Sequence, residues 1–150
     1  MSNAFTVHLV TWCDGEPLLR AIREKVFIQE QQVPVELEWD GLDAGCEHVL
    51  ALAASGNAIG CGRITPDGHI GRIAVLPEWR RQQVGSSILE LLVDYARGRH
   101  YPKVELNAQV QAMPLYEKAG FHAEGEVFLD ANIPHRKMLL LLKDRSPSSQ

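Results

Sequence analysis

The sequence predicts a mixed α/β domain, with strands and helices in the order β-α-β-β-β-α-β-α-β-β. Two segments carry apolar residues at helical spacing, and several shorter segments are apolar or alternating runs bounded by turn residues. The chain has 150 residues, of which 45% are hydrophobic and 23% charged. These values are typical of one globular domain, which we expect over residues 1–145, with residues 146–150 as a polar, disordered tail.

The first half of the chain contains one strand and one helix before a long acidic segment. Apolar and polar residues alternate over residues 5–12, which predicts a strand. Pro17 is expected to open a helix, because apolar residues recur at helical spacing as far as Phe27, and Pro34 ends the pattern. Residues 35–47 are predicted to form an acidic, solvated loop. Three further strands are predicted over residues 48–54, 58–65 and 70–76.

The second half contains two helices and three strands. A helix is predicted over residues 85–97, where apolar residues return at helical spacing. A shorter helix over residues 114–119 is closed by Gly120, because glycine is favoured just after a helix ends. Strands are predicted over residues 104–109, 124–129 and 136–143. No internal repeat, linker or second domain is indicated.

Charge and hydrophobic pattern argue against two classes of partner. The chain carries 15 Lys and Arg against 19 Asp and Glu, a formal net charge of -4. Nucleic-acid-binding proteins usually carry a basic excess, so no nucleic-acid partner is expected. The longest apolar run, residues 138–142, is far shorter than a membrane span, and the N-terminus lacks the pattern of a signal peptide. No membrane association is expected either.

The three cysteines favour a reducing compartment. Cys13, Cys46 and Cys61 form no Cys-x-x-Cys pair and are odd in number, which argues against a disulfide framework. Cys46 precedes Glu47 and His48, but no second Cys/His group completes a metal site, so neither a bound metal nor a thiol nucleophile is expected. A cytoplasmic location is therefore predicted.

The strongest chemical signal lies between the strand that ends near Val75 and the helix that follows. Arg80 and Arg81 occupy the connecting loop, and the helix starts with the small residues 85–87, Gly-Ser-Ser. A helix N-terminus presents unpaired N–H groups and the positive end of the helix dipole, and the arginines add fixed charge. These features suit a phosphate or pyrophosphate, although a plain surface loop with a Gly-Ser helix start would carry the same residues.

The same segment resembles the acyl-CoA-binding motif of the GCN5-related N-acetyltransferases (GNAT), a strand followed by Arg/Gln-x-x-Gly-x-Gly/Ala. Arg80 occupies the first position and Gly85 the last, whereas Gln83 replaces the first glycine. This replacement departs from the family pattern, because glutamine adopts positive φ less readily than glycine. Residues 112–121, Ala-Met-Pro-Leu-Tyr-Glu-Lys-Ala-Gly-Phe, are similar to a second family motif, Ala-x-x-Leu-Tyr-Glu-Lys-x-Gly-Phe.

Further segments resemble the ElaA-like subgroup of this family. They are residues 23–31, Pro34, Asp40, Asp43, His48 and the tripeptide Ile133-Pro134-His135. The whole resemblance covers about residues 10–140. It implies the GNAT acyl-CoA N-acyltransferase fold, in which a central, mostly antiparallel sheet is flanked by helices and is splayed where CoA enters.

The resemblance also implies an activity. The chain is expected to be an acyl-CoA-dependent N-acyltransferase that moves an acetyl group from acetyl-CoA to a primary amine by direct attack. The acceptor would be a small-molecule amine or an exposed protein amine. Backbone groups of residues 73–75 would bind the pantetheine arm and polarise the thioester, and Tyr116 would protonate the departing sulfur. Outside this motif, a tyrosine on a short helix more often packs against the core.

Two sets of site residues follow from the resemblance. The set expected to bind acetyl-CoA comprises Ile73, Ala74, Val75, Arg80, Arg81, Gln82, Gln83, Val84, Gly85, Ser86, Ser87, Gln109, Ala112 and Tyr116. The general base, or a contact to the acceptor, is expected among Glu30, Glu38, Asp40, Asp43, His48 and His135. The sequence does not rank these six. A structural role is the alternative for His48, and His135 is expected in an exposed loop.

Two other functions are compatible with the sequence. One is a non-catalytic acyl-CoA-binding regulator on the same fold, and the other is an interaction module whose acyl-CoA site has decayed at Gln83. The retained Tyr116 favours the enzyme. A homodimer is also compatible with the sequence.

Overall fold

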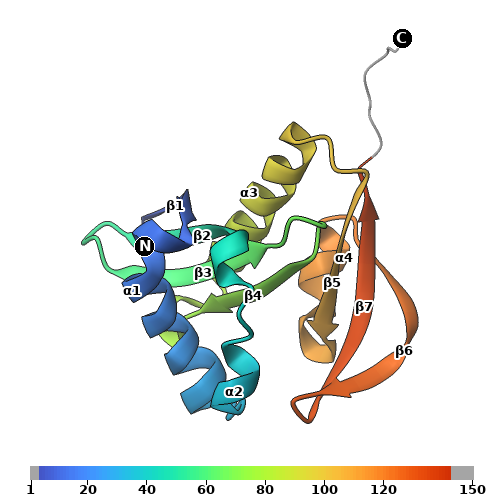
Figure 1. Ribbon diagram of the computed structural model, residues 1–150, viewed down its shortest axis with the longest axis horizontal. Helices are drawn as coiled ribbons and strands as arrows, with labels where there is room; N and C mark the ends of the chain where they lie inside the picture. The colour runs from blue at the N-terminus through green and yellow to red at the C-terminus, as the bar shows by residue number, and fades with distance from the viewer. Residues whose placement is uncertain (1–3, 143–150) are drawn as a thin grey trace.

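The computed structural model describes residues 4–142 as two antiparallel sheets with helices packed around them (Figure 1). Residues 146–150, for which the sequence predicts a disordered tail, lie outside the described residues. The first sheet contains, in spatial order, β1 (Phe5–Thr11), β2 (Glu47–Ala53), β3 (Ala58–Ile64) and β4 (Ile70–Val75). The second contains β5 (Lys103–Gln109), β7 (Ile133–Leu141) and β6 (His122–Asp130).

Four α-helices connect these strands. They are α1 (Trp12–Arg23), α2 (Val35–Glu38), α3 (Val84–Gly98) and α4 (Met113–Lys118). The predicted mixed α/β class and the predicted order of strands and long helices are confirmed, with element ends shifted by a few residues. None of the helices between residues 4 and 142 is long and apolar enough to span a membrane.

Helices α1 and α3 cover opposite faces of the first sheet. Along β2, Val49 and Ala51 belong to the buried cluster that contains the apolar face of α3. Leu50 lies between them in sequence and packs instead with Leu19 and Ile22 of α1. Since successive residues of a strand point to opposite faces, this sheet is buried on both sides.

Two glycines in β3 allow α3 to approach the sheet closely. A Cβ added at Gly62 would lie 2.8 Å from Ile88 and 3.1 Å from Leu92, and one at Gly60 would lie 3.0 Å from Ile88. Any larger residue would push the helix outward, because interiors are close-packed. Helix packing therefore accounts for the Gly-Cys-Gly sequence of this strand.

Helix α1 begins earlier than the sequence predicts. The Thr11 hydroxyl accepts a hydrogen bond from the Asp14 N–H at 3.2 Å and caps the helix, so Pro17 lies inside the helix and not at its start. Leu18, which the helical spacing places on the apolar face, is 44% exposed. The Thr11 cap satisfies the Asp14 N–H, one of the donors that the first turn of a helix leaves unpaired, so the helix can begin before Pro17.

The acidic segment over residues 35–47 is not a solvated loop. Glu36 is exposed, whereas Glu38, Asp40 and Asp43 meet three arginines from α1, β3 and β4. We call this group the Arg–carboxylate cluster, and it comprises Arg23, Arg63, Arg72, Glu38, Asp40 and Asp43. Three positive and three negative charges balance one another, so the segment can pack against the sheet without leaving a buried charge unpaired.

The arginines of the cluster reach several carboxylates at once. Arg23 donates to Glu38 at 2.7 Å and to Asp43 at 2.6 Å. Arg63 donates to Asp40 at 2.6 Å and to Asp43 at 2.8 Å. Burial alone would raise the pKa of Asp40, but the hydrogen bonds from Arg63 and the attraction of its charge bring that pKa down to about 2.

The two sheets meet only at one end. Among the described residues, one bridge links the two sheets here: it joins His69, just before β4, to Glu105 of β5 in parallel, and the Glu105 N–H donates to the Gly68 carbonyl at 3.0 Å. Beyond that point the strands diverge, as Figure 1 shows between β4 and β5. This divergence is the splay that the family resemblance implies.

The Arg–carboxylate cluster yields a prediction about stability. Replacing Asp40 with Asn should lower the free energy of unfolding at pH 7 by about 2 kcal/mol, because the pKa of this carboxyl falls from 3.8 to about 2 on folding. A depressed pKa stabilises the fold above the unfolded value, so the difference between variant and wild type should shrink as the pH falls from about 4 to about 2. Urea denaturation across this range measures both effects.

The matched control is Glu16→Gln, which removes an exposed ion pair with Arg20. It should cost less than about 0.5 kcal/mol at any pH. An Asp40→Asn variant as stable as wild type at pH 7 would contradict the role of the cluster.

Candidate active site

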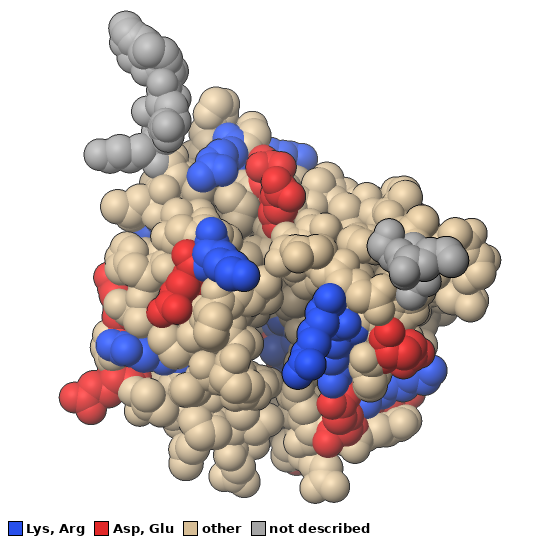
Figure 2. Space-filling view, turned by 180° about the vertical axis from the view of Figure 1, so that it is seen from behind, with Lys and Arg blue, Asp and Glu red and all other residues tan. Residues whose placement is uncertain are grey.

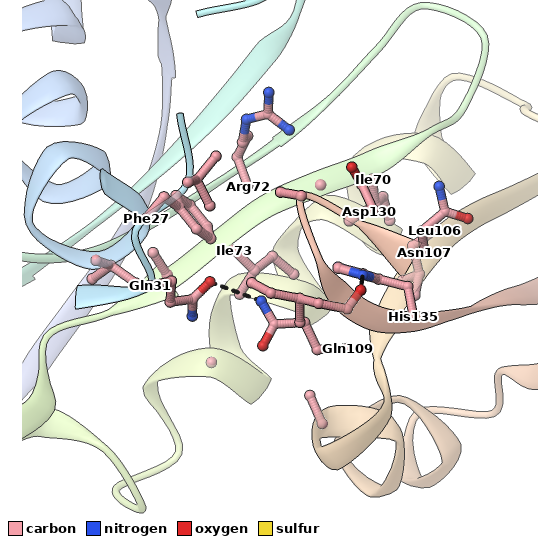
Figure 3. Close-up of a pocket in the computed structure, with 18 of the residues that line it drawn as sticks. Phe27, Gln31, Ile70, Arg72, Ile73, Leu106, Asn107, Gln109, Asp130 and His135 are labelled. Atoms are coloured by element: carbon pink, nitrogen blue, oxygen red, sulfur yellow. Dashed lines mark hydrogen bonds between the residues drawn. The ribbon is translucent and has the colours of Figure 1, made fainter. Parts of the chain in front are cut away.

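A cavity of about 400 Å³ occupies the space between β4 and β5. Residues of β4, β5, α3, α4 and the β6–β7 hairpin line it, together with the segment that follows α1. Figure 3 shows Phe27 and Gln31 on one side, Asn107, Asp130 and His135 on the other, and Ile73 between them. The cavity therefore joins the two sheets and the N-terminal helical segment at one place.

A π-helical turn brings the N-terminal segment to the cavity. α1 continues into this turn over Glu24–Glu30, and the Gln31 N–H bonds to the carbonyl of Val26, five residues earlier. Wide turns of this kind are rare in proteins overall, and many of those that do occur lie at functional sites. Phe27 and Gln31 both line the cavity.

A β-bulge shapes the wall that β4 contributes. The register with β3 shifts between Cys61 and Arg63, and Arg72 adopts a positive φ of 54° at the same place. A non-glycine residue in this conformation is strained, and the bulge bends the strand. Ile73, Ala74 and Val75, the residues expected to bind the thioester arm, follow the bulge and line the cavity.

The loop before α3 keeps a left-handed backbone without glycine. Arg81 has a φ of 64° and Gln83 a φ of 73°. Gln83 holds the N-cap position of α3 without a capping hydrogen bond from its side chain, and Gly85, in the first turn of the helix, lines the cavity. The first N–H groups of a helix have no partner within it, so an anion at this end of the cavity would find hydrogen-bond donors.

The other residues of the predicted loop lie away from the cavity wall. Val84 is buried in the core against α3 and the first sheet. Ser86 lines a second hollow of about 320 Å³ between α3 and α4. Arg81, Gln82, Gln83 and Ser87 do not line the cavity.

Arg80 is held by an acidic partner. Its two terminal nitrogens donate to both Glu30 oxygens at 2.8 Å, and its Nε donates to the Val75 carbonyl at 2.9 Å. The hydrogen bonds from Arg80 hold the pKa of Glu30 below its usual range. On the face shown in Figure 2, basic and acidic side chains are interspersed, and basic side chains lie beside a hollow near its centre.

Tyr116 of α4 lines the cavity. Its ring packs edge-on against Phe121 at 6.1 Å between centroids. Burial raises the pKa of its hydroxyl to about 12, and the described residues offer that hydroxyl no hydrogen-bond partner. The hydroxyl therefore stays protonated at neutral pH and is available as a donor. Gln109 and Ala112 also line the cavity.

His135 lies in β7 and not in the exposed loop that the sequence predicts. It is 9% exposed, and its ring stacks on Phe128. Its Nδ1 lies 2.6 Å from the Ile133 carbonyl, as the dashed line in Figure 3 marks. A carbonyl can only accept, so Nδ1 carries the hydrogen and Nε2 of the neutral ring is left as an acceptor.

The remaining base candidates are engaged elsewhere. His48 is 1% exposed, packs on Trp12 at 5.3 Å and hydrogen-bonds the Asp43 carbonyl through Nε2, outside the cavity. Burial lowers its pKa. Asp40 and Asp43 belong to the Arg–carboxylate cluster and do not line the cavity. Glu38 does line it, but its Oε2 accepts from Arg23 and lies 3.1 Å from Nε of Arg72.

Gln31 belongs to the segment 23–31 that resembles the ElaA-like subgroup, but no sequence pattern marks its contact across the cavity. Gln31 accepts a hydrogen bond from Gln109 Nε2 at 2.9 Å, which joins the N-terminal segment to the end of β5 across the cavity. Arg72, Asn107 and Asp130 also line the cavity. Their positions depend on the bulge and on the splay, and neither has a local sequence pattern.

Comparison with known proteins places this geometry in a family. The model of the Acetyltransferase (GNAT) domain matches residues 18–142. The uncharacterized N-acetyltransferase YjcF of Bacillus subtilis (strain 168) is 39% identical over 122 residues, which cover 79% of this chain and 86% of the relative.

Solved structures have the same fold. An acyl-CoA N-acyltransferase from Pseudomonas aeruginosa superposes with a TM-score of 0.79 at 26% identity, covering 89% of this chain and 98% of that one. Escherichia coli ElaA has the same TM-score and coverage at 24% identity. The chain belongs to the GNAT acetyltransferase family and is an acyl-CoA-dependent N-acyltransferase.

Proposed function

We propose that this chain transfers the acetyl group of acetyl-CoA directly to a small primary amine within the splay between β4 and β5. One observation carries the proposal: the free edge of β4 at residues 73–75, Tyr116 and His135 surround a single cavity. These groups offer, in turn, backbone partners for the thioester arm, an acid for the sulfur and a base for the amine.

The loop before α3 supports the binding of acetyl-CoA. Left-handed residues are strained unless they are glycine, yet Arg81 and Gln83 both retain this conformation next to the N-terminus of α3. An interaction module whose acyl-CoA site has decayed would not need this strained backbone conformation. Because Glu30 holds Arg80, we assign the pyrophosphate mainly to the N–H groups at the start of α3 and to Arg81.

The reaction requires one proton to leave the amine and one to reach the sulfur. As the C–N bond forms and the C–S bond breaks, Nε2 of His135 accepts the proton of the nitrogen and Tyr116 donates to the sulfur. Backbone donors after the bulge stabilise the developing oxyanion, a contribution of typically ~3 kcal/mol per donor. Holding both reactants in one cavity adds the advantage of proximity.

The volume of the cavity supports a small acceptor, and the free cysteines support a cytoplasmic location. A cavity of about 400 Å³ must hold both the acyl arm and the amine, which favours a small acceptor over a folded protein. All three cysteines are free thiols, as a reducing cytoplasm would keep them.

Tyr116→Phe tests the proposed function most simply. Wild type should be protected from thermal unfolding by acetyl-CoA and should release CoA when an amine is added. The variant keeps the ring and its packing on Phe121, so the Michaelis constant for acetyl-CoA should change little while kcat falls by about 100-fold. Steady-state kinetics with a thiol reagent measures both. Full turnover in the variant would leave Tyr116 as a packing residue.

His135→Asn should remove the proposed base while keeping the hydrogen bond to the Ile133 carbonyl. The asparagine amide can still donate to the Ile133 carbonyl, but it has no acceptor at the position of Nε2. We expect kcat to fall by roughly 100-fold or more, with the melting temperature near that of wild type. Raising the pH should recover part of the rate, because more of the amine is already neutral. A variant with wild-type kcat at neutral pH would exclude His135 as the base.

Substitutions of Gln83 test whether acetyl-CoA binds at the loop before α3. Gln83→Gly removes left-handed strain of about 1 kcal/mol and should keep the dissociation constant within about threefold. Gln83→Val should weaken binding by about tenfold, because a β-branched residue resists positive φ. His100, with a φ of 62° beyond the far end of α3, provides the control: His100→Val should lower stability without changing affinity. Wild-type affinity of Gln83→Val by calorimetry would place the cofactor elsewhere.

A further inference from the structure

Asp130 differs from the other carboxylate that lines the cavity in having no charged partner among residues 4–142. Two carboxylates line the cavity, Glu38 and Asp130. Glu38 is engaged by Arg23 and Arg72 inside the Arg–carboxylate cluster. Asp130, at the end of β6, is exposed, and among residues 4–142 its side chain has no ion pair or hydrogen bond. Its charge is therefore available to a ligand.

The β6–β7 hairpin holds Asp130 at the cavity wall. Asp130 pairs with Ile133 across a two-residue turn, in which Ala131 has a φ of 52° and Asn132 a φ of 65°. A two-residue hairpin turn of this type requires a positive φ at both central residues, and Ala131 adopts such a φ only with strain. The tight turn fixes Asp130 on the same side of the cavity as His135, as Figure 3 shows.

The charges around the cavity leave Asp130 unbalanced. Arg72 is matched by Glu38 and Asp40, and Arg80 is matched by Glu30. The other polar side chains that line the cavity are the amides of Gln31, Asn107 and Gln109, the imidazoles of His69 and His135, and the hydroxyl of Tyr116. The acceptor side therefore carries one uncompensated negative charge.

The wall opposite Asp130 carries an apolar patch beside Gln31. Phe27, Val33 and Leu37 line the cavity there, and Figure 3 shows Phe27 across from Asp130 and His135. A ligand that satisfies both sides has a cationic nitrogen at one end and an apolar body at the other.

We propose that Asp130 is the acceptor-binding residue, and that it selects small primary amines with an apolar body and no carboxylate near the nitrogen. The inference rests on the proposed function and names its acceptor class. Asp130 holds the ammonium form beside Nε2 of His135. The ammonium gives one proton to solvent, directly or through His135, before the neutral amine attacks the thioester.

The test compares two acceptors that differ only by a carboxylate, phenethylamine and phenylalanine. Wild type should prefer phenethylamine by about tenfold or more in kcat/KM, because the carboxylate of phenylalanine would lie beside Asp130. Asp130→Asn should raise the KM for phenethylamine about fivefold to tenfold, with kcat within about twofold, and should reduce the preference by a similar factor. The affinity for acetyl-CoA should not change.

Glu126→Gln provides the matched control, since it removes one exposed carboxylate from the same strand outside the cavity. It should leave both acceptors unaffected. An unchanged preference in Asp130→Asn, or equal use of the two acceptors by wild type, overturns the role of Asp130. Turnover with neither acceptor, while acetyl-CoA still protects the protein, overturns the acceptor class. A protein that acetyl-CoA does not protect contradicts the proposed function itself.

Discussion

The loss of pairing between β4 and β5 is the constraint on which the rest of the site depends. Two parallel neighbours in a sheet would normally satisfy each other's backbone groups, but here they share a bridge only at His69 and Glu105. The bulge at Arg72 then bends β4 away. An edge strand without a neighbour suits a ligand that itself carries amides, as the pantetheine arm does. Tyr116 reaches the same space from α4, and His135 reaches it from β7 of the second sheet.

The Arg–carboxylate cluster determines which charges remain at the site. It balances Glu38, Asp40 and Asp43 against three arginines, and it holds the segment that carries Leu37 at the cavity. A residue in such a cluster is a poor general base, because removing its charge leaves arginines buried without a partner. We therefore assign the two proton transfers to His135 and Tyr116, whose polar side-chain atoms form no ion pair among the described residues.

Local patterns made the framework predictable. The strands, α3 and the loop from Arg80 to Ser87 follow from alternation, helical spacing and a motif in adjacent residues. The rest depends on contacts between distant segments: Arg23 meets Glu38 and Asp43, and Arg72 meets Asp40, only after the sheet has formed. Asp130 lies on a strand with almost no buried residues, so no periodicity marks it. Pro17 misled the prediction of α1, because a cap at Thr11 outweighs the preference of proline for the first turn.

Backbone amide chemical shifts, recorded by nuclear magnetic resonance as acetyl-CoA is added, test most directly whether the splay holds the cofactor. Binding along the free edge of β4 and at the start of α3 should produce the largest shifts at residues 73–75 and 84–86. The hollow between α3 and α4 should respond weakly at Val93 and Arg97, which lie far along that helix. Large shifts at those two residues, with residues 73–75 unchanged, would contradict the placement of acetyl-CoA between the two sheets.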